Sequence, residues 1–434
     1  MKPPLARGLY SAASYLLTPV AFGRLLIKSR KNPDYRSYLG ERLGYIKKSK
    51  SGTKHLHFHA VSVGETLAAV PVIKDLNTDH PDWSFSISVT TPTGREQAQK
   101  HLSSIAEVSF LPFDLPDAVA RFVNRINPDL MVLVETELWP NLINYCAKQD
   151  IPRVLINGRM SEKSAANYKK MASVTRPMMQ QLDLVLAQFE EDAQRFVDLG
   201  CAAESVLQQG NLKFDIQLTE ELRQHAKQYK ESWQLYKRPV FIAASTHPGE
   251  EAMLLDQYQR LLDVHTDLLM ILVPRHPDRT AEVEQLVSNR NISSIRRTQL
   301  NKVDDNGAEL IDSQVLILDT LGELSLFYGL SDIAFVGGSL IEHGGHNPIE
   351  PALWGLPILT GTHCFNFLEI TKQLADSGAL VQCSSVDQLF DKLQELLGDS
   401  QLQEVMGKKS ADVLKTNRGS LHRQKQQIES LLVG

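Results

Sequence analysis

Short apolar runs alternate along most of the chain with longer stretches that carry apolar residues at helical spacing. Runs rich in β-branched residues are typical of buried parallel strands, and the periodic stretches between them are typical of connecting helices. We therefore expect two α/β series, each a doubly wound parallel sheet. The predicted strands are 55–61, 85–89, 130–134, 154–156 and 184–187 in the first series, and 240–244, 268–273, 315–318, 333–336 and 358–359 in the second.

The predicted division into domains rests on the length of the chain and on one polar stretch within it. A chain of 434 residues is too long for a single ordinary core. A polar, helix-like stretch at about 220–237 separates the two series. We expect an N-terminal segment followed by two Rossmann-like domains, and the final helix is able to cross back to the first of them. The predicted boundaries are 1–40, 41–215 and 216–434.

The N-terminal segment is apolar from Leu9 to Ile27, apart from hydroxyls and Arg24, and it is followed by several Lys and Arg residues. Residues 1–50 carry a net charge of +9, although the whole chain carries −5. A run of 19 residues interrupted by Pro19 is at the lower limit for a membrane span. The pattern favours a helix that lies at the cytoplasmic face of a bilayer. The alternative is an ordinary helix packed on the first domain.

Several classes of protein are disfavoured by absent patterns. The four cysteines are scattered without a CxxC pair, which argues against a disulfide framework and a zinc site. No GxGxxG follows the first predicted strand, and no GxxxxGK[ST] occurs in the chain. These absences argue against a typical dinucleotide dehydrogenase and a P-loop ATPase.

One glycine-rich stretch predicts an anion site in the second domain. The strand at 332–336 runs into Gly337-Gly338, and a helix start follows. Asn347 suits the N-cap, Pro348 the first helical position, and Glu350 the capping-box acid. Exposed N–H groups beside a helix start favour a phosphate. The alternative is a glycine-rich turn without a ligand, and Glu350 also suits a ribose diol.

Polar residues follow other predicted strands as well, at the edge where doubly wound sheets bind ligands. In the first domain these are carboxylates: Glu65 follows one strand, and Glu135 and Glu137 follow another. Glu65 is either a general base or an acid favoured in a first helical turn. In the second domain the strands end in hydroxyls and groups that can carry positive charge, at Ser245-Thr246-His247 and Arg275-His276. This division indicates acid/base chemistry in one domain and an anionic ligand in the other.

A metal site is not expected. His55, His57 and His59 would project from one face of a strand. They have no acidic or cysteine partner at ligand spacing, so the metal interpretation is the weaker one.

Five motifs together resemble the bacterial 3-deoxy-D-manno-octulosonic acid (Kdo) transferase family. The resemblance runs from the apolar N-terminus, through Tyr35–Gly44, to about residue 370, and the linker and the last 60 residues match least. The motifs are His59-Ala60-Val61-Ser62-Val63-Gly64-Glu65, Glu135-Thr136-Glu137-Leu138-Trp139-Pro140-Asn141, Gly210-Asn211-Leu212-Lys213-Phe214-Asp215, Val273-Pro274-Arg275-His276-Pro277 and Phe335–Glu350.

The resemblance implies a GT-B glycosyltransferase, in which two Rossmann-like domains face across a cleft and the second holds the nucleotide sugar. Proteins like it move Kdo from CMP-Kdo to the 6′-hydroxyl of the lipid A precursor (lipid IVA) in lipopolysaccharide biosynthesis, with inversion. They work at the cytoplasmic face of the inner membrane. No cofactor, bound metal or nucleic-acid partner is expected.

Roles for individual residues follow from the motifs and the strand ends together. We expect Glu65 to act as the general base and Glu137 to position substrate, while Glu135, Arg95 and Arg159 bind the acceptor. The expected donor-binding residues are Ser245, Thr246, His247, Arg275, His276, Gly337, Gly338, His346, Asn347 and Glu350. Two alternatives stay open: a GT-B transferase that uses another nucleotide sugar, and a non-catalytic, membrane-surface lipid A-binding protein.

Overall fold

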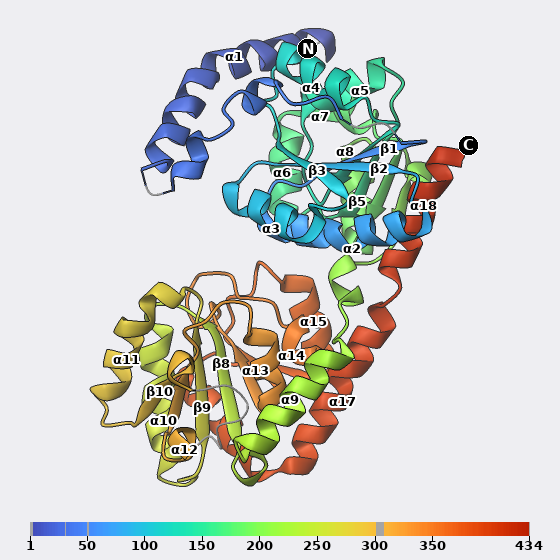
Figure 1. The fold of residues 1–434 in the computed structure, drawn as a ribbon. Coiled ribbons are helices and arrows are strands. Elements are labelled where there is room, and N and C mark those ends of the chain that lie inside the picture. The colour runs from blue at the N-terminus through green and yellow to red at the C-terminus, as the bar shows by residue number, and fades with distance from the viewer. Residues whose placement is uncertain (1–2, 31, 50–51, 301–307, 434) are drawn as a thin grey trace. The chain divides into compact units, whose positions relative to one another are not determined.

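The computed structural model describes residues 3–30, 32–49, 52–300 and 308–433 (Figure 1). The chain divides into two compact units. Unit 1 comprises Met1–Asp215 together with Arg418–Gly434, and unit 2 comprises Ile216–Asn417. Each unit has its own sheet and its own hydrophobic core.

The sheet of unit 1 is parallel, with strand order β3-β2-β1-β4-β5-β6-β7. The five strands expected from the sequence are confirmed, and β3 and β7 at the two edges were not predicted. The strands are β1 (His55–His59), β2 (Ser84–Val89), β3 (Ala106–Phe110), β4 (Leu130–Val134), β5 (Arg153–Gly158), β6 (Leu184–Ala187) and β7 (Val206–Gln208).

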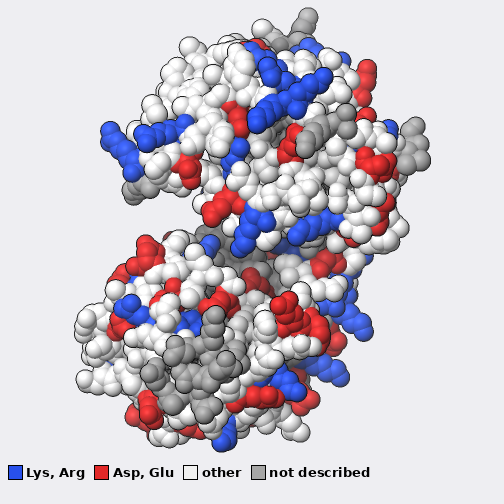
Figure 2. Space-filling view, in the orientation of Figure 1, with Lys and Arg blue, Asp and Glu red and all other residues white. Residues whose placement is uncertain are grey.

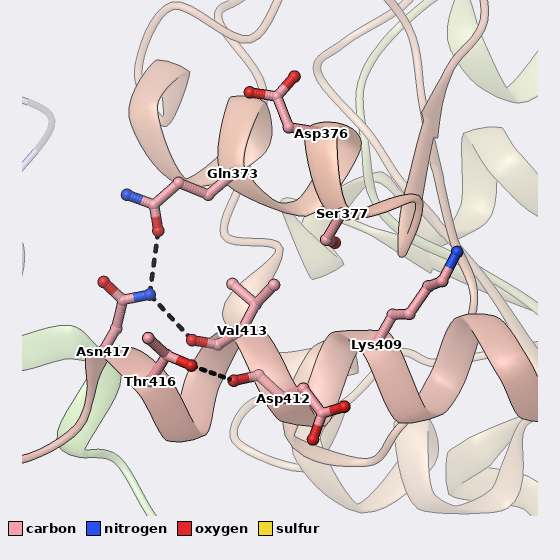
Figure 3. Close-up of a pocket in the computed structure, with 8 residues that line it drawn as sticks. All are labelled: Gln373, Asp376, Ser377, Lys409, Asp412, Val413, Thr416 and Asn417. Atoms are coloured by element: carbon pink, nitrogen blue, oxygen red, sulfur yellow. Dashed lines mark hydrogen bonds between the residues drawn. The ribbon is translucent and has the colours of Figure 1, made fainter.

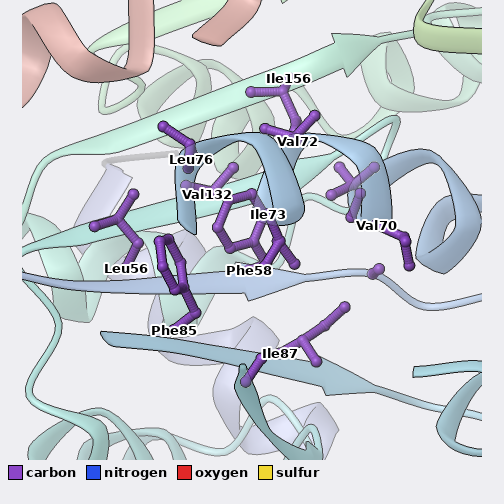
Figure 4. Close-up of a cluster of buried hydrophobic side chains, with 14 of the residues drawn as sticks. Leu56, Phe58, Val70, Val72, Ile73, Leu76, Phe85, Ile87, Val132 and Ile156 are labelled. Carbon is purple, nitrogen blue, oxygen red and sulfur yellow. The ribbon is translucent and has the colours of Figure 1, made fainter. Parts of the chain in front are cut away.

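Helices cover both faces of this sheet, as expected for a doubly wound fold (Figure 1). On one face, Leu56 and Phe58 of β1 pack with Ile73 and Leu76 of α2 (Figure 4). The helices are α1 (Pro3–Lys28), α2 (Val63–Asp79), α3 (Pro92–Leu102), α4 (Pro116–Ile126), α5 (Pro140–Lys148), α6 (Glu162–Lys170), α7 (Ala172–Met179), α8 (Glu190–Leu199) and α18 (Ser420–Val433).

The three histidines of β1 are buried and hydrogen-bonded to serines of β2. Each imidazole contacts one or two serine hydroxyls, at distances between 2.7 and 3.1 Å. Burial lowers the pKa of His57 and lowers that of His59 to about 3, so both rings are neutral at pH 7. These side chains therefore belong to the core of the sheet.

Unit 2 has a second parallel sheet, with strand order β10-β11-β9-β8-β12-β13-β14. Its expected strands are also confirmed, and the two edge strands, β10 and β14, were again not predicted. The strands are β8 (Val240–Thr246), β9 (Leu269–Pro274), β10 (Ser294–Arg296), β11 (Val315–Ile317), β12 (Ile333–Val336), β13 (Ile358–Thr360) and β14 (Leu380–Gln382). The helices are α9 (Glu220–Ser232), α10 (Glu250–Leu262), α11 (Thr280–Ser288), α12 (Ala308–Ile311), α13 (Leu324–Leu330), α14 (Ile349–Leu353), α15 (Leu368–Ser377), α16 (Val386–Gly398) and α17 (Ser400–Asn417).

The N-terminal segment forms one helix, α1, that is attached to unit 1 by polar and aromatic contacts. Tyr10 donates to Asp114 at 3.0 Å, Ser11 donates to Asn141 at 3.0 Å, and the ring of Phe22 meets that of Phe113 edge-on. Among the described residues, no helix has the length and apolar character needed to cross a bilayer.

Candidate functional site

Each sheet has one point where the strand order reverses. In unit 1 the chain builds β1, β2 and β3 toward one edge and then places β4 on the other side of β1. In unit 2 the same reversal places β12 beside β8. The loops after these strands are where doubly wound folds bind ligands. Most of the predicted site residues lie in these four loops or at the strand and helix ends that border them.

In unit 1, Glu65 lies in the first turn of α2 and forms a capping box with Ser62. Its Oε2 accepts hydrogen bonds from the N–H groups of Val61 at 2.5 Å and Ser62 at 3.0 Å. The capping interpretation of Glu65 is therefore correct. It does not exclude a role as base, because both of these bonds use one carboxylate oxygen.

Two further carboxylates follow β4. Glu135 has a φ of +59°, a left-handed conformation that is strained for glutamate and is typical of functional loops. Its carboxylate meets the ammonium of Lys213 at 3.1 Å. Glu137 accepts a hydrogen bond from the indole N–H of Trp139 at 3.1 Å.

Two of these carboxyls, Glu65 and Glu137, have raised pKa values. Burial, followed by the charge of Glu135, raises the pKa of Glu65. Burial, followed by the charge of Glu65, raises the pKa of Glu137 to about 7. Carboxyls with raised pKa values, one of them near neutrality, are suited to accepting and holding a proton.

The other residues predicted to bind the acceptor have different surroundings. The guanidinium of Arg95 pairs with Glu41 at 2.6 Å and stacks over the ring of Tyr38. This gives Arg95 a structural role, and its part in acceptor binding stays a prediction. The backbone of Arg159 joins the carboxylate loop, because its carbonyl accepts from the hydroxyl of Thr136 at 2.7 Å.

In unit 2 the loop after β8 places His247 within a group of imidazoles. Ser245, just before it, has a φ of +56°. His247 Nε2 and His346 Nε2 are 2.8 Å apart, so one proton is shared between the two rings. The ring of His343 lies 3.7 Å from that of His247, and the ring of His276 lies 6.1 Å away.

The imidazole group lies near the positive charge of Arg275. Burial, together with the neighbouring imidazoles and Arg275, lowers the pKa of His247 and of His346 to about 4. In the described part of the chain, His247, His343 and His346 are the residues whose spacing would suit a metal ion. Because Arg275 repels a cation, the electrostatics favour an anion at this place.

The glycine turn after β12 differs from the prediction that its backbone N–H groups are open to a phosphate. The N–H of Gly337 donates to the carbonyl of Ala244 at 2.8 Å. The N–H groups of Gly338, Ser339 and Leu340 donate to the carboxylate of Glu250, at 2.7, 2.9 and 3.0 Å. These amides are already occupied within the protein, so they do not form the open anion site that the sequence indicated.

The helix start that was predicted at Asn347 also differs in detail. Helix α14 begins at Ile349 and its N-cap is Pro348, so Asn347 is one residue too early for the cap and Pro348 is not the first helical residue. The side chain of Asn347 accepts a hydrogen bond from the Ile349 N–H at 3.1 Å. The carboxylate of Glu350 accepts from the side-chain amide of Asn347 at 3.3 Å, so no capping box forms. Burial raises the pKa of Glu350, and the positive charge of Arg275 acts against this rise. Glu350 therefore lies within the electrostatic reach of Arg275.

A separate open pocket of about 400 Å³ lies between α15 and α17 (Figure 3). Asn417 donates to Gln373 at 3.0 Å across this pocket. None of the residues that were predicted to bind substrate lines it. Its lining residues are Gln373, Asp376, Ser377, Lys409, Asp412, Val413, Thr416 and Asn417.

Three residues that belong to these loops or contact them were missed from the sequence. Lys213 belongs to a motif quoted above, but no role was given to it. Glu250 stands three residues after His247, which is capping-box spacing and could have indicated its position. His343 lies inside the glycine-rich stretch, where no pattern separates it from a loop residue.

Two stretches of the sequence, which contain most of these loops, match known family models. Residues 37–216 match the model described as 3-deoxy-D-manno-octulosonic-acid transferase (kdotransferase). Residues 307–413 match the model described as glycosyl transferases group 1. HepE from Anabaena, solved in complex with UDP, has a similar fold, with a TM-score of 0.58 at 15% identity over 87% of this chain and 99% of that one. Two parallel α/β units with these matches define a glycosyltransferase of the GT-B class.

Full-length relatives identify the family. The 3-deoxy-D-manno-octulosonic acid transferase of Haemophilus influenzae is 38% identical over 96% of both chains. The transferase of the same name from Rickettsia bellii is 30% identical over 92% of both chains. The chain belongs to the 3-deoxy-D-manno-octulosonic acid transferase family.

Proposed function

We propose that this enzyme transfers Kdo from CMP-Kdo to the 6′-hydroxyl of the lipid A precursor, with inversion at the anomeric carbon. The observation that carries the proposal is the cluster of Glu65, Glu135 and Glu137 at the strand reversal of unit 1. Transfer to a hydroxyl needs a base for the hydroxyl proton, and in this cluster Glu65 and Glu137 have raised pKa values. The names of the Haemophilus and Rickettsia relatives support Kdo as the sugar.

In this mechanism Glu65 accepts the proton of the acceptor hydroxyl as the new glycosidic bond forms. One of its oxygens is held by two backbone N–H groups, which fixes the direction of the carboxylate. The other oxygen is left for the substrate. Glu137, with its pKa near 7, is suited to a hydrogen bond that orients the acceptor.

The donor belongs to unit 2. CMP leaves with a negatively charged phosphate, and Kdo itself carries a carboxylate. Arg275 offers N–H donors and positive charge for these groups, and the neutral imidazoles of His247 and His346 add polar N–H groups. We assign the ribose hydroxyls to Glu350, because a half-buried carboxylate within reach of Arg275 can accept their hydrogen bonds.

The direct test incubates the protein with CMP-Kdo and lipid A precursor and determines the product masses. We expect a mass increase of one or more Kdo units and release of CMP. UDP sugars offered in place of CMP-Kdo should give no product. Transfer from a UDP sugar would favour a different GT-B transferase, and acceptor binding without any transfer would favour a binding protein.

The surface of α1 supports a second part of the proposal, that the enzyme works on the inner membrane's cytoplasmic face. Leu5, Leu9, Leu16, Val20 and Ile27 lie along one side of α1, and Leu16 is 79% exposed. Burying such side chains in lipid contributes about 1.5–3 kcal/mol each at most. Lys and Arg side chains gather over the end of α1 and the segment after it (Figure 2). Next to anionic lipid each of these adds about 1 kcal/mol.

Replacing Leu9, Leu16 and Val20 with glutamate should lower binding to vesicles with anionic lipid by roughly tenfold or more. Activity on detergent-dispersed acceptor should be kept, because the contacts of α1 with Asp114 and Asn141 stay in place. Co-sedimentation with vesicles measures the binding. The matched control is Leu321→Glu, which changes a leucine of unit 2 that is 80% exposed. Undiminished vesicle binding by the triple variant would remove α1 from the membrane contact.

A further inference from the structure

We propose that Glu250 is a positioning residue for the donor site, acting as an internal anion that holds the loops carrying His247 and His346 together. Its side chain is fully buried, at 0% exposure. The inference rests on the proposed function only in assigning the imidazole group to the donor; the bridge itself is independent of that assignment.

The carboxylate of Glu250 is bound by backbone N–H groups from two loops. Oε2 accepts from His247 at 3.0 Å and from Gly338 at 2.7 Å. Oε1 accepts from Ser339 at 2.9 Å and from Leu340 at 3.0 Å. Four N–H donors match the four lone-pair sites of an ionised carboxylate, and bonds to a charged acceptor are stronger than neutral ones.

This bridge reaches the imidazoles through Gly338. Gly338 has a φ of +68°, and its Cα faces both rings. A Cβ at that position would lie 3.1 Å from His346 Cδ2 and 3.4 Å from His247 Cδ2. Glu250 therefore binds the N–H group of Gly338, and the rings of His247 and His346 both pack against that same residue. Displacing the turn moves both rings and breaks their 2.8 Å contact.

The loop after β12 is also held by hydrogen bonds of the Ser339 side chain. The hydroxyl of Ser339 donates to the carbonyl of Val336 at 2.6 Å and accepts from the N–H of Gly361 at 2.8 Å. Glu250 thus supplies the link that joins this well-fixed turn to the β8–α10 loop. No amide of the Gly338–Leu340 turn is left for the donor phosphate.

The test compares Glu250→Gln with wild type by calorimetric titration with CMP. Glutamine keeps the shape, but its NH₂ group faces backbone donors in either orientation, so part of the bridge is lost. We expect roughly tenfold weaker CMP binding, a matching rise in the donor KM, and an unchanged acceptor KM. In ¹⁵N spectra of labelled histidines, the hydrogen-bonded Nε2 signal of the His247–His346 pair should disappear.

Two control variants separate positioning from a general loss of stability. Glu251 is also fully buried at the start of α10, but its carboxylate pairs with Arg279 at 2.8 Å. Leu393 is a core residue of α16 in the same unit. Glu251→Gln and Leu393→Ala should lower Tm as much as Glu250→Gln or more, yet keep the imidazole signal and the CMP affinity.

The outcomes are distinguishable. If wild-type protein does not bind CMP, the donor assignment fails, and the imidazole signal alone then decides whether Glu250 holds the loops. If Glu250→Gln binds CMP as tightly as wild type and keeps the imidazole signal, the inference is wrong. Equal losses of CMP affinity in all three variants would also overturn it, because they would show a stability effect.

Discussion

Replacement of Glu65 by glutamine is expected to lower turnover by about 100-fold or more, the usual contribution of a general base. The amide oxygen can still accept the N–H groups of Val61 and Ser62, so the start of α2 is kept. CMP-Kdo binding should change little, because the donor is assigned to unit 2. Single-turnover rates with saturating substrates measure the chemical step directly.

Glu137→Gln is the matched comparison for this prediction. A positioning role predicts a higher acceptor KM or a smaller loss of rate. If Glu137→Gln abolished turnover while Glu65→Gln kept it, the base would be Glu137. The two carboxyls can also be followed by titration, because the charge of Glu65 contributes to raising the pKa of Glu137 to about 7. In Glu65→Gln the pKa of Glu137 should therefore fall, as ¹³C spectra of labelled glutamate would show.

The pH dependence of kcat provides a separate test of the role of Glu65 as base. Burial and the charge of Glu135 raise the pKa of Glu65, so its base form is lost at a higher pH than for a free glutamate. The acidic limb of kcat should therefore lie above the pH where an exposed glutamate titrates.

Arg275→Ala is expected to weaken CMP-Kdo binding by roughly 2 kcal/mol, or about 30-fold, since a charged hydrogen bond to the donor is removed. Arg275 is exposed, and within the described residues its guanidinium makes no hydrogen bond or ion pair. Calorimetric affinity for CMP-Kdo is the measurement, with turnover expected to fall only at subsaturating donor.

Arg279→Ala is the control for Arg275→Ala, because it removes a nearby positive charge that is already paired. Its guanidinium pairs with Glu251 at 2.8 Å and with Glu282 at 2.9 Å, so it is already neutralised. Arg279→Ala should reduce donor affinity much less than Arg275→Ala. Unchanged affinity in Arg275→Ala, or an equal loss in both variants, would show that Arg275 makes no specific contact with the donor.

The sequence by itself determined the central part of both sheets. Strands such as β4 and β12 are buried on both faces, so they must be continuous apolar runs, and such runs are visible without a structure. The four strands that were missed, β3, β7, β10 and β14, are the four edge strands. An edge strand pairs on one side only and stays partly exposed, so its sequence needs no uninterrupted apolar run.

The sequence also determined which residues stand at the ends of the central strands, and so most of the candidate site. Glu65, Glu137 and His247 were found because parallel strands deliver their carboxyl ends to one edge. The partners of these residues were decided by tertiary structure alone. Whether the amides of a glycine turn are open to a phosphate depends on what else reaches them, and here a carboxylate 88 residues earlier in the chain does so. Local sequence specifies the turn, but only the folded chain brings Glu250 to it.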